Sequence, residues 1–454
     1  MIAMSLSEAS HTVDGHLLGA DMIFRGVSTD SRTISEGELF IALRGPKFNG
    51  EDMVEDAFEK GAVGAIIQGI SPTKKPVIQV SNTLVALGAL ARCWRLRFNI
   101  PVVGITGSVG KTTVKEMLGS ILNLSGQTLM TSKNFNNEIG VAQTLLQLSE
   151  KHEFVVLELG ARKPKDIQIL SDVSKPTVGV VTLCAPAHLE GFVDMETIAQ
   201  TKGELFTSLS EEGVGIINLN DPYALMWQSM LGGRKSLTFG DEGDVCASDI
   251  SYTNAGLSFE LILKDDGSRR ILLRHKGVHH VVNALAAATA ARALGLDLDL
   301  IENGLNSAPE PDQRLTSRDG AYKSHLIDDS YNANPTSVRA AIDVLAAEQG
   351  SRWLVLGDMG ELGEERKKFH VEMGSYAAAE NLDRLFTIGE LSEDSSKAFG
   401  KGALHFENQL DLQKFLLNEL RKSTGRVTIL VKGSRFMALE KTVEALSFEQ
   451  GRSC

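Results

Sequence analysis

The feature that most restricts the fold of this chain is a phosphate-loop signature at residues 102–113. A hydrophobic run, Val102 to Ile105, precedes the sequence TGSVGKTT, which opens an amphipathic segment. A strand, a glycine loop and a helix in this order cradle phosphates, because backbone N–H groups turn inward and the lysine adds a full charge. The strict pattern is not met, since Ile105 replaces its first glycine. The sequence therefore predicts a variant nucleotide loop formed by Thr106, Gly107, Ser108, Val109, Gly110, Lys111, Thr112 and Thr113.

The chain around this loop alternates strand-length apolar runs with segments of helical spacing, which is typical of α/β folds with mostly parallel sheets. After Lys111, apolar residues recur at helical spacing from Val114 to Leu122, so we expect this face to lie on a sheet. The alanine-rich segment from Val281 to Leu294 predicts a buried helix. We expect strands at 101–105, 154–159, 177–183 and 214–218.

The length of the chain and a proline-bearing stretch near residue 310 predict three α/β domains. The chain has 454 residues, and domains average about 150 residues. We expect a small α/β domain at 1–98, a central phosphate-loop ATPase domain at 99–310 and a Rossmann-like domain at 311–454. The proline-bearing stretch from Ser307 to Asp312 is the predicted linker. Beyond it, strands are expected at 324–327, 353–356, 384–388 and 427–431.

The charge balance disfavours nucleic acid as a partner. The chain has 46 basic and 58 acidic residues, a net charge of -12, so its overall field repels polyanions. An anionic ligand must therefore be held by local groups. We also see no secretion signal, no apolar run long enough to span a membrane and no paired cysteine motif, so we expect a cytoplasmic protein.

A carboxylate is predicted beside the phosphates. Glu158 ends the strand expected at 154–159, and ligands gather at the carboxyl ends of strands in open α/β sheets. Glu158 and Thr112 are therefore candidate magnesium ligands. The alternative to a metal-binding role is that Glu158 is a residue at the end of a strand that forms a salt bridge. By spacing alone, His188 would be a structural histidine and Lys202 a solvated lysine.

The ordered motifs of the whole chain resemble the Mur ligases, the ATP-dependent amide-forming enzymes of peptidoglycan precursor synthesis. The resemblance is carried by the phosphate loop, NFNNEIG at 134–140, PAHLE at 186–190, DSYNANP at 329–335, LGDMGELG at 356–363, KGSR at 432–435 and DSR at 30–32. It is greatest for the members that join D-alanyl-D-alanine to UDP-N-acetylmuramoyl-tripeptide. It implies these two small-molecule substrates, ATP, two magnesium ions, a monomer and a bacterial cytoplasmic location.

The resemblance also implies roles for individual residues. Lys111, His188 and Lys202 would be catalytic, and Thr112, Glu158, His188 and Lys202 would lie at magnesium positions, with Lys202 carbamylated. Asn283, Arg314 and Asp329 would join the loop in binding the nucleotide. The implied substrate-binding residues are Ser28, Asp30, Ser31, Arg32, Asn134, Asn136, Asn137, Asn332 and Asn334.

The chain departs from the family pattern in two places. Arg162 to Asp166 replaces the family's N-H-P-G-E, and Thr182 to His188 replaces T-N-I-G-P-A-H. The ligand positions remain, and the residues around them differ from the family pattern.

The implied chemistry makes two physical demands. A carboxylate must first attack the γ-phosphate of ATP to become an acyl phosphate, and local positive charge must offset the repulsion between the two anions. Carbamylation of Lys202 requires the neutral amine, hence a pKa lowered by burial or neighbouring cations. We also expect the Ser307–Asp312 linker to let the domains close around the ligands.

Two other functions are compatible with the nucleotide loop. One is another amide ligase of the superfamily, either a different Mur ligase or a folylpolyglutamate synthase. The other is a regulatory module that hydrolyses ATP to switch a partner. The segments DSYNANP and LGDMGELG argue against the first.

Overall fold

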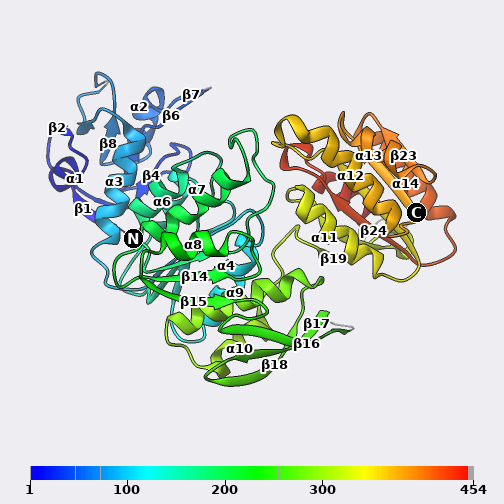
Figure 1. Cartoon of the computed structure of the whole chain (residues 1–454). Coiled ribbons are helices and arrows are strands. Elements are labelled where there is room, and N and C mark those ends of the chain that lie inside the picture. The colour runs from blue at the N-terminus through cyan, green and yellow to red at the C-terminus, as the bar shows by residue number, and fades with distance from the viewer. Residues whose placement is uncertain (1, 47, 72, 254–255, 448–454) are drawn as a thin grey trace.

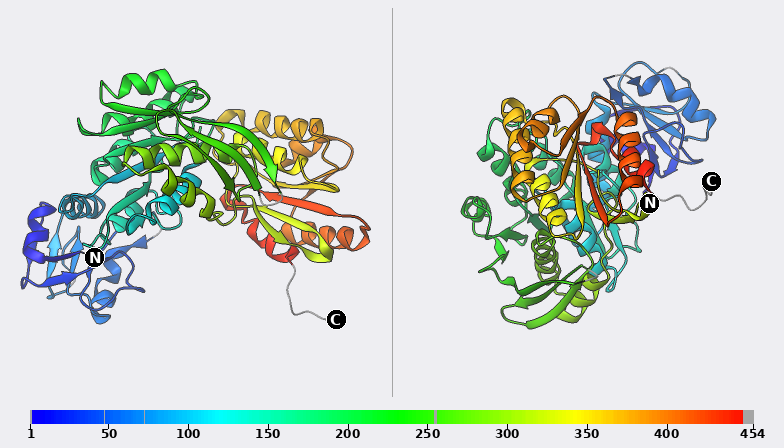
Figure 2. Two further views of the ribbon diagram at one scale, coloured as in Figure 1. Left: turned by 90° about the horizontal axis from the view of Figure 1, so that it is seen from below. Right: turned by 90° about the vertical axis from the view of Figure 1, so that its right-hand side faces the viewer.

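The computed structural model describes residues 2–46, 48–71, 73–253 and 256–447. The chain forms consecutive α/β domains that run from blue to red in Figure 1. The central domain lies between the N-terminal and C-terminal domains in Figure 1 and in the left view of Figure 2. Within the described ranges, none of the helices combines the length and apolar character that crossing a bilayer requires.

The N-terminal domain is built on a small sheet in the order β2-β9-β8-β5-β4, parallel except for the β2–β9 pair. Its strands are β2 (His16–Leu18), β4 (Val27–Ser28), β5 (Leu39–Ile41), β8 (Gly64–Ile67) and β9 (Val77–Gln79). Two small antiparallel pairs add β1 (Ala3–Ser5) with β3 (Ile23–Arg25), and β6 (Arg44–Gly45) with β7 (Phe48–Asn49). The helices are α1 (Leu6–Thr12), η1 (Gly50–Met53), α2 (Val54–Glu59) and α3 (Thr83–Arg95).

The central domain contains a sheet in the order β11-β12-β10-β13-β14-β15-β16-β17-β18, parallel up to the β15–β16 pair and antiparallel beyond it. Its strands are β10 (Val102–Thr106), β11 (Thr128–Met130), β12 (Phe154–Glu158), β13 (Val178–Val181), β14 (Val214–Asn218), β15 (Lys235–Phe239), β16 (Val245–Thr253), β17 (Gly256–Leu263) and β18 (Gly267–Leu273). Its helices are α4 (Lys111–Leu122), α5 (Glu138–Leu145), α6 (Asp166–Ser174), α7 (Met195–Thr207), α8 (Ala224–Met230), α9 (His279–Ala293) and α10 (Leu298–Ser307). The phosphate-loop strand β10 is interior to this sheet, as the mostly parallel prediction requires.

The helices predicted after Lys111 and at Val281–Leu294 are confirmed as α4 and α9. On α4, Val114, Met117 and Leu118 are fully buried, as are Ile121 and Leu122 one turn later. The small alanine side chains of α9 are also buried and share a core with α4. Burial of this apolar face, rather than helix propensity, is what fixes α4 beneath the loop.

The C-terminal domain has a doubly wound sheet in the order β19-β20-β24-β21-β22-β23, antiparallel only at β19–β20. Its strands are β19 (Thr316–Asp319), β20 (His325–Asp329), β21 (Ser351–Gly357), β22 (Arg384–Ile388), β23 (Ala403–Phe406) and β24 (Val427–Lys432). Its helices are η2 (Ala321–Lys323), α11 (Pro335–Ala346), η3 (Gly363–Glu365), α12 (Arg366–Ala379), α13 (Ser392–Phe399), α14 (Gln409–Lys422), η4 (Arg435–Met437) and α15 (Glu440–Leu446).

Alternate residues of β21 enter the two cores of this domain. Trp353 and Val355 pack into one core, while Leu354 and Leu356 pack into the other. Because successive strand side chains point to opposite faces, helices cover both sides of the sheet. The predicted Rossmann-like class is confirmed.

Some predicted boundaries shift by a few residues. The strand expected at 177–183 is β13, Val178–Val181, because Thr182 and Leu183 leave the sheet to bind the phosphate loop. Each main sheet lies inside one of the three predicted segments, and Ala308 to Pro311 has no regular structure. The limits 1–98, 99–310 and 311–454 themselves stay predictions.

Candidate active site

The phosphate loop is held open by glycines that no other residue could replace. Gly107 has φ 149° and Gly110 has φ 86°. A Cβ on Gly107 would lie 1.9 Å from the Thr182 hydroxyl oxygen, and one on Gly110 would lie 2.4 Å from the Asn283 amide oxygen. The loop therefore depends on close backbone approach as well as on a left-handed conformation.

The segment after β13 anchors this loop. The Thr182 hydroxyl donates to the carbonyl of Val109 (2.6 Å), and the Ser108 amide donates to the carbonyl of Leu183 (2.7 Å). The Ser108 hydroxyl donates to the carbonyl of Ala185 (2.8 Å). These bonds fix the loop at the carboxyl edge of the sheet, where a ligand can approach α4 along its N-terminus.

Lys111 and Glu158 form the charged centre of the site. The Lys111 ammonium donates to the carbonyl of Gly107 (2.7 Å), and burial lowers its pKa although Glu158 opposes the shift. Burial alone would raise the pKa of Glu158, but the charges of Lys111 and Arg314 hold it below its ordinary value. Glu158 is therefore a buried carboxylate that stays ionised.

Glu158 is oriented by two side chains from the loops around it. The Thr112 hydroxyl donates to one carboxylate oxygen (2.8 Å), and the Asn136 amide donates to the other (2.8 Å). The two residues predicted as magnesium ligands, Thr112 and Glu158, are thus in contact. Their oxygen atoms at a helix N-terminus suit a hard divalent cation.

Lys202 is buried on α7, not solvated, with 3% of its surface exposed. Burial and the charge of Lys111 lower its pKa to about 7. This lowered pKa meets the condition that carbamylation of Lys202 sets, a neutral amine near neutral pH. Asp221 lies near enough to oppose the shift, and its carboxylate accepts from the amide of Cys184 (2.7 Å).

Arg314 brings the C-terminal domain onto the phosphate loop. Its guanidinium donates to the Thr112 hydroxyl (3.0 Å) and lies 4.3 Å from the centroid of the Tyr331 ring. Asp329 lies behind it in a buried ion pair with Lys432 (2.6 Å). The Lys432 ammonium also donates to the carbonyl of Asn332 (2.9 Å). The structure therefore brings Arg314 to the loop directly and places Asp329 within range of its charge.

His188 pairs with the C-terminal domain. It has φ 56°, and its Nδ1 contacts the carboxylate of Glu361, which lies in the loop after β21. This contact lowers the pKa of Glu361. His188 therefore lies at the domain boundary, while the other members of the predicted metal set are Thr112, Glu158 and Lys202. Within the described ranges, no group of three or more His, Cys, Asp or Glu side chains is arranged to hold a metal ion.

The predicted sugar-nucleotide residues lie at a turn of the N-terminal domain. The Arg32 guanidinium donates to Asp30 (2.7 Å) and lowers the pKa of this carboxyl to about 2. The Ser28 hydroxyl accepts from the Asp30 amide (3.1 Å), and Ser31 is buried. The neighbouring Thr29 hydroxyl accepts from Gln143 of α5 (2.8 Å), which ties this turn to the central domain.

Two predicted substrate residues act as helix caps. The Asn137 side chain accepts from the amide of Gly140 (2.9 Å) at the start of α5, and the Asn334 side chain accepts from the amide of Ser337 (2.8 Å) at the start of α11. Asn134 lies in the same loop as Asn136, whose amide donates to its carbonyl (2.8 Å). Capping accounts for two of these asparagines locally.

Sequence reasoning missed Thr182 and Asp221 as parts of the site. Both follow parallel strands of the central sheet, β13 and β14. The rule that selected Glu158, a polar residue at the carboxyl end of a strand, would have selected them as well. The role of Asn136 as a partner of Glu158 has no such signal, because the contact joins residues 22 positions apart.

Family comparisons cover most of the chain. Residues 23–95 match "Mur ligase family, catalytic domain", residues 105–291 match "Mur ligase middle domain", and residues 313–435 match "Mur ligase, glutamate ligase domain". Among curated relatives, the UDP-N-acetylmuramoyl-tripeptide–D-alanyl-D-alanine ligase of Escherichia coli is 39% identical, over 98% of this chain and 99% of the relative. The ligase of the same name from Bacillus subtilis is 33% identical, over 98% and 99%.

Solved structures are similar over the whole fold. A crystal structure of MurF from Acinetobacter baumannii has a TM-score of 0.94 and 32% identity, with 98% of each chain covered. MurF from Thermotoga maritima in complex with ADP has a TM-score of 0.83 and 28% identity, with 93% of this chain and 96% of that chain covered. A folylpolyglutamate synthase from Mycobacterium tuberculosis, at 18% identity, shares the fold alone.

Proposed function

The chain belongs to the Mur ligase family, and we propose that it joins D-alanyl-D-alanine to the terminal carboxylate of UDP-N-acetylmuramoyl-tripeptide. It is an ATP-dependent amide ligase of peptidoglycan precursor synthesis, and its products are the UDP-linked pentapeptide, ADP and phosphate. One observation carries this assignment on the structural side: Arg314 of the C-terminal domain reaches Thr112 of the phosphate loop. A site completed by a second domain suits a reaction that must exclude water from an activated acyl group.

Amide formation proceeds in two displacements. A carboxylate oxygen of the tripeptide forms a bond to the γ-phosphorus of ATP, and the bond from that phosphorus to ADP breaks. The dipeptide nitrogen, after losing a proton to solvent, then bonds to the acyl carbon, and the carbon–oxygen bond to phosphate breaks. The anions of the first step repel each other, so Lys111 and the loop N–H groups stabilise the charge that develops on the transferred phosphoryl group.

Thr112 and Glu158 would hold Mg²⁺ beside the phosphates, and a second ion would involve His188. The hydroxyl and the ionised carboxylate, joined at 2.8 Å, fit such a cation. When bound, magnesium supplies positive charge to the phosphate oxygens. Asn136 and Arg314 then keep these two oxygen donors in place.

Lys202 would carry a carbamate. Its neutral amine would add to carbon dioxide with loss of one proton, which creates a carboxylate at the end of the side chain. The pKa of about 7 supports this role, because the reactive neutral form is then present near neutral pH. A buried carboxylate in this place would face the positive charge of Lys111.

The remaining site residues divide between the substrates. Asn283, which lies against Gly110, would contact the adenine, and Asp329 would support Arg314 on the nucleotide. Ser28, Asp30, Ser31 and Arg32 would bind the UDP-muramoyl group. Asn134, Asn136 and Asn137 from the central domain and Asn332 and Asn334 from the C-terminal domain would approach the peptide. We further propose a cytoplasmic monomer with the domain limits 1–98, 99–310 and 311–454.

The test is a coupled assay of phosphate release with UDP-N-acetylmuramoyl-tripeptides that carry either diaminopimelate or lysine. We expect phosphate release that strictly requires both the tripeptide and D-alanyl-D-alanine, with formation of the pentapeptide. Release without the dipeptide would favour an ATP-hydrolysing switch. Transfer of glutamate to a folate, with no activity on the muramoyl peptide, would overturn the assignment in favour of another ligase of this fold.

A further inference from the structure

A second lysine of α4, Lys115, is buried and has no part in the chemistry described above. Its side chain is 2% exposed, and its ammonium forms an ion pair with the neighbouring Glu116 (2.8 Å). Taking a charge out of water is costly, and an apolar side chain of similar volume is often as stabilising at such a position. The bonds of the ammonium, rather than burial of the stem, therefore account for a lysine here.

The ammonium of Lys115 reaches the residue that directly follows β11. It donates to the carbonyl of Thr131 (2.7 Å), a residue that is itself buried. The Thr131 amide donates to the carbonyl of Val156 (3.0 Å), and the Thr131 hydroxyl oxygen accepts from the amide of Glu158 (3.0 Å). Thr131 therefore holds the last residue of β12, and Lys115 holds Thr131.

The loop that begins at Thr131 contacts Glu158 a second time. The Asn136 amide donates to the Glu158 carboxylate (2.8 Å), and the Asn136 carbonyl accepts from the amide of Gly160 (2.8 Å). A Cβ on Gly160 would lie 2.9 Å from the side-chain oxygen of Asn136, so the two segments are closely packed. Residues 131–137 thus fix both the carboxylate of Glu158 and the backbone around it.

Helix α4 acts on Glu158 by two routes. Thr112 and Lys115 are three positions apart, so both lie on the same side of the helix. The Thr112 hydroxyl donates directly to the carboxylate (2.8 Å), whereas Lys115 acts through Thr131 on the backbone. A shift of the loop 131–137 relative to α4 would change the direction of the carboxylate relative to the Thr112 hydroxyl.

On the basis of the proposed function, we propose that Lys115 is a positioning residue: it locks Thr131 and the loop 131–137 so that Glu158 presents its carboxylate to the magnesium ion of the nucleotide complex. The ammonium of Lys115 is occupied by the Thr131 carbonyl and by Glu116, so its effect passes through the loop. Partners that orient metal ligands in this way contribute about 10- to 100-fold to metal affinity. Loss of the ammonium should therefore weaken metal binding and leave binding of the dipeptide unchanged.

The test measures binding of Mn²⁺ to the enzyme–ADP complex by electron paramagnetic resonance, because Mn²⁺ takes the same oxygen ligands as Mg²⁺. The variant Lys115→Met keeps the length and the apolar packing of the side chain, and we expect it to weaken Mn²⁺ binding by about 10-fold. Thr131→Val, which removes the acceptor of the Glu158 amide at nearly constant shape, should have a similar effect. Thr131→Ser keeps this acceptor and should bind Mn²⁺ like the wild-type enzyme.

The double variant Lys115→Met/Thr131→Val tests the route of the effect. Because both side chains act through one chain of contacts, the double variant should bind Mn²⁺ about as weakly as the more affected single variant. Fully additive losses would mean that Lys115 does not act through Thr131, and would overturn this assignment.

The matched control is Ile121→Ala. This residue is fully buried on the same helix and packs against Gly304 of α10. The control should lower the midpoint of thermal unfolding and keep the wild-type affinity for Mn²⁺. Wild-type affinity in Lys115→Met, or an equal loss in Ile121→Ala, would reduce Lys115 to a residue that only stabilises the fold. If Lys115→Met does not fold, equal affinities in Thr131→Val and Thr131→Ser would overturn the proposal.

A kinetic measurement distinguishes failure of this proposal from failure of the proposed function. In the pentapeptide assay, Lys115→Met should need about 10-fold more Mg²⁺ for its half-maximal rate, while the KM for the dipeptide stays within about twofold. If the wild-type enzyme forms the pentapeptide and Lys115→Met keeps the wild-type Mn²⁺ affinity, the positioning role fails and the ligase function stands. If the wild-type enzyme forms no pentapeptide but Lys115→Met binds Mn²⁺ more weakly, the ligase function fails and the positioning role stands. Absence of Mn²⁺ binding to the wild-type ADP complex would overturn the positioning role.

Discussion

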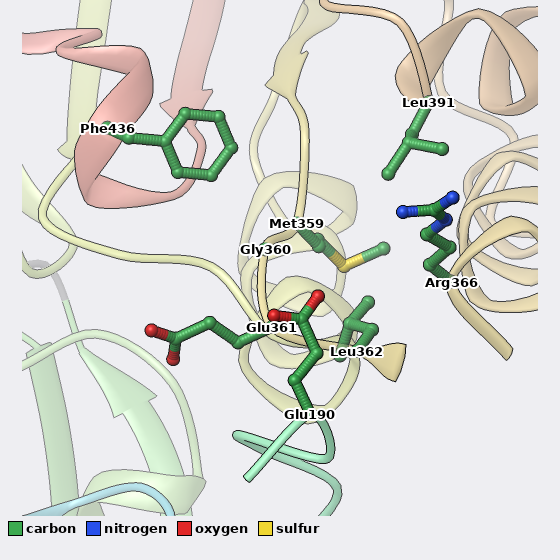
Figure 3. A pocket seen from close by; sticks show the side chains of 8 residues that line it. All are labelled: Glu190, Met359, Gly360, Glu361, Leu362, Arg366, Leu391 and Phe436. Carbon is green, nitrogen blue, oxygen red and sulfur yellow. The ribbon is translucent and has the colours of Figure 1, made fainter. Parts of the chain in front are cut away.

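The phosphate loop and a pocket at the boundary between the central and C-terminal domains are built in different ways. The loop depends on backbone geometry: glycines at Gly107 and Gly110, a helix N-terminus and one buried lysine. The pocket, of about 310 Å³, has charged side-chain ends from separate domains, Glu190 from the central domain and Arg366 from the start of α12 (Figure 3). Substitutions in the loop should therefore abolish chemistry, whereas substitution of a charged end in the pocket should leave the nucleotide site intact.

The largest effect is expected from Lys111→Ala. Removal of the charge that offsets repulsion between the carboxylate and the triphosphate should lower kcat by about 10³-fold. Phosphate release and pentapeptide formation measure this loss, with the exposed Lys151→Ala as the control. Product formation at the wild-type rate would show that the loop is not the catalytic centre.

A somewhat smaller loss is expected from Lys202→Ala, roughly 10- to 100-fold or more, as for other groups that support a metal site. If the carbamate is the active form, short carboxylic acids added to the variant should restore part of the activity. In the wild-type enzyme, labelled carbon dioxide should give a carbamate signal by NMR. Absence of both the rescue and the signal would eliminate this role of Lys202.

Arg314→Met tests the contact between the C-terminal domain and the phosphate loop. It removes the bond to Thr112 and one of the charges that keep Glu158 ionised. We expect the KM for ATP to rise about 10-fold, with little change in that for the dipeptide. The exposed Arg421→Met serves as the control. A rise confined to the dipeptide KM would mean that Arg314 does not act on the nucleotide.

The smallest effect is expected from Asn334→Ala. Loss of the cap of α11 should cost about 1 kcal/mol and lower the midpoint of thermal unfolding by roughly 2–4 °C. Calorimetry measures the shift. If Asn334 also binds a substrate, the KM for that substrate will rise in the variant. Unchanged KM values for ATP, the muramoyl tripeptide and the dipeptide would show that Asn334 acts only as a helix cap.

Local secondary structure and fold class could be predicted from the sequence. The strand, loop and helix around Lys111, the buried alanine helix α9 and the class of the C-terminal domain are confirmed, because periodicity and glycine placement express them locally. Pairings between distant segments could not be predicted. The bonds of Asn136 to Glu158 and of Arg314 to Thr112 exist only because the fold brings separate loops together.

The burial of individual charged side chains also could not be predicted from the sequence. Lys202 on an isolated helix gives no sign that it is enclosed, and its lowered pKa arises from neighbours on other elements. Similarly, nothing in the sequence marks Lys115 as buried, because lysines are mostly exposed on protein surfaces. Its bond to the carbonyl of Thr131 joins residues 16 positions apart.

Helix α5 links two distant parts of the molecule at its opposite ends. Near its start, Asn136 binds Glu158, and near its end, Gln143 binds Thr29 beside the turn that holds Asp30. A helix of this kind, about 1.5 Å long per residue, is a rigid spacer. Under the proposed binding of the UDP-muramoyl group at that turn, α5 would hold this group at a fixed separation from Glu158.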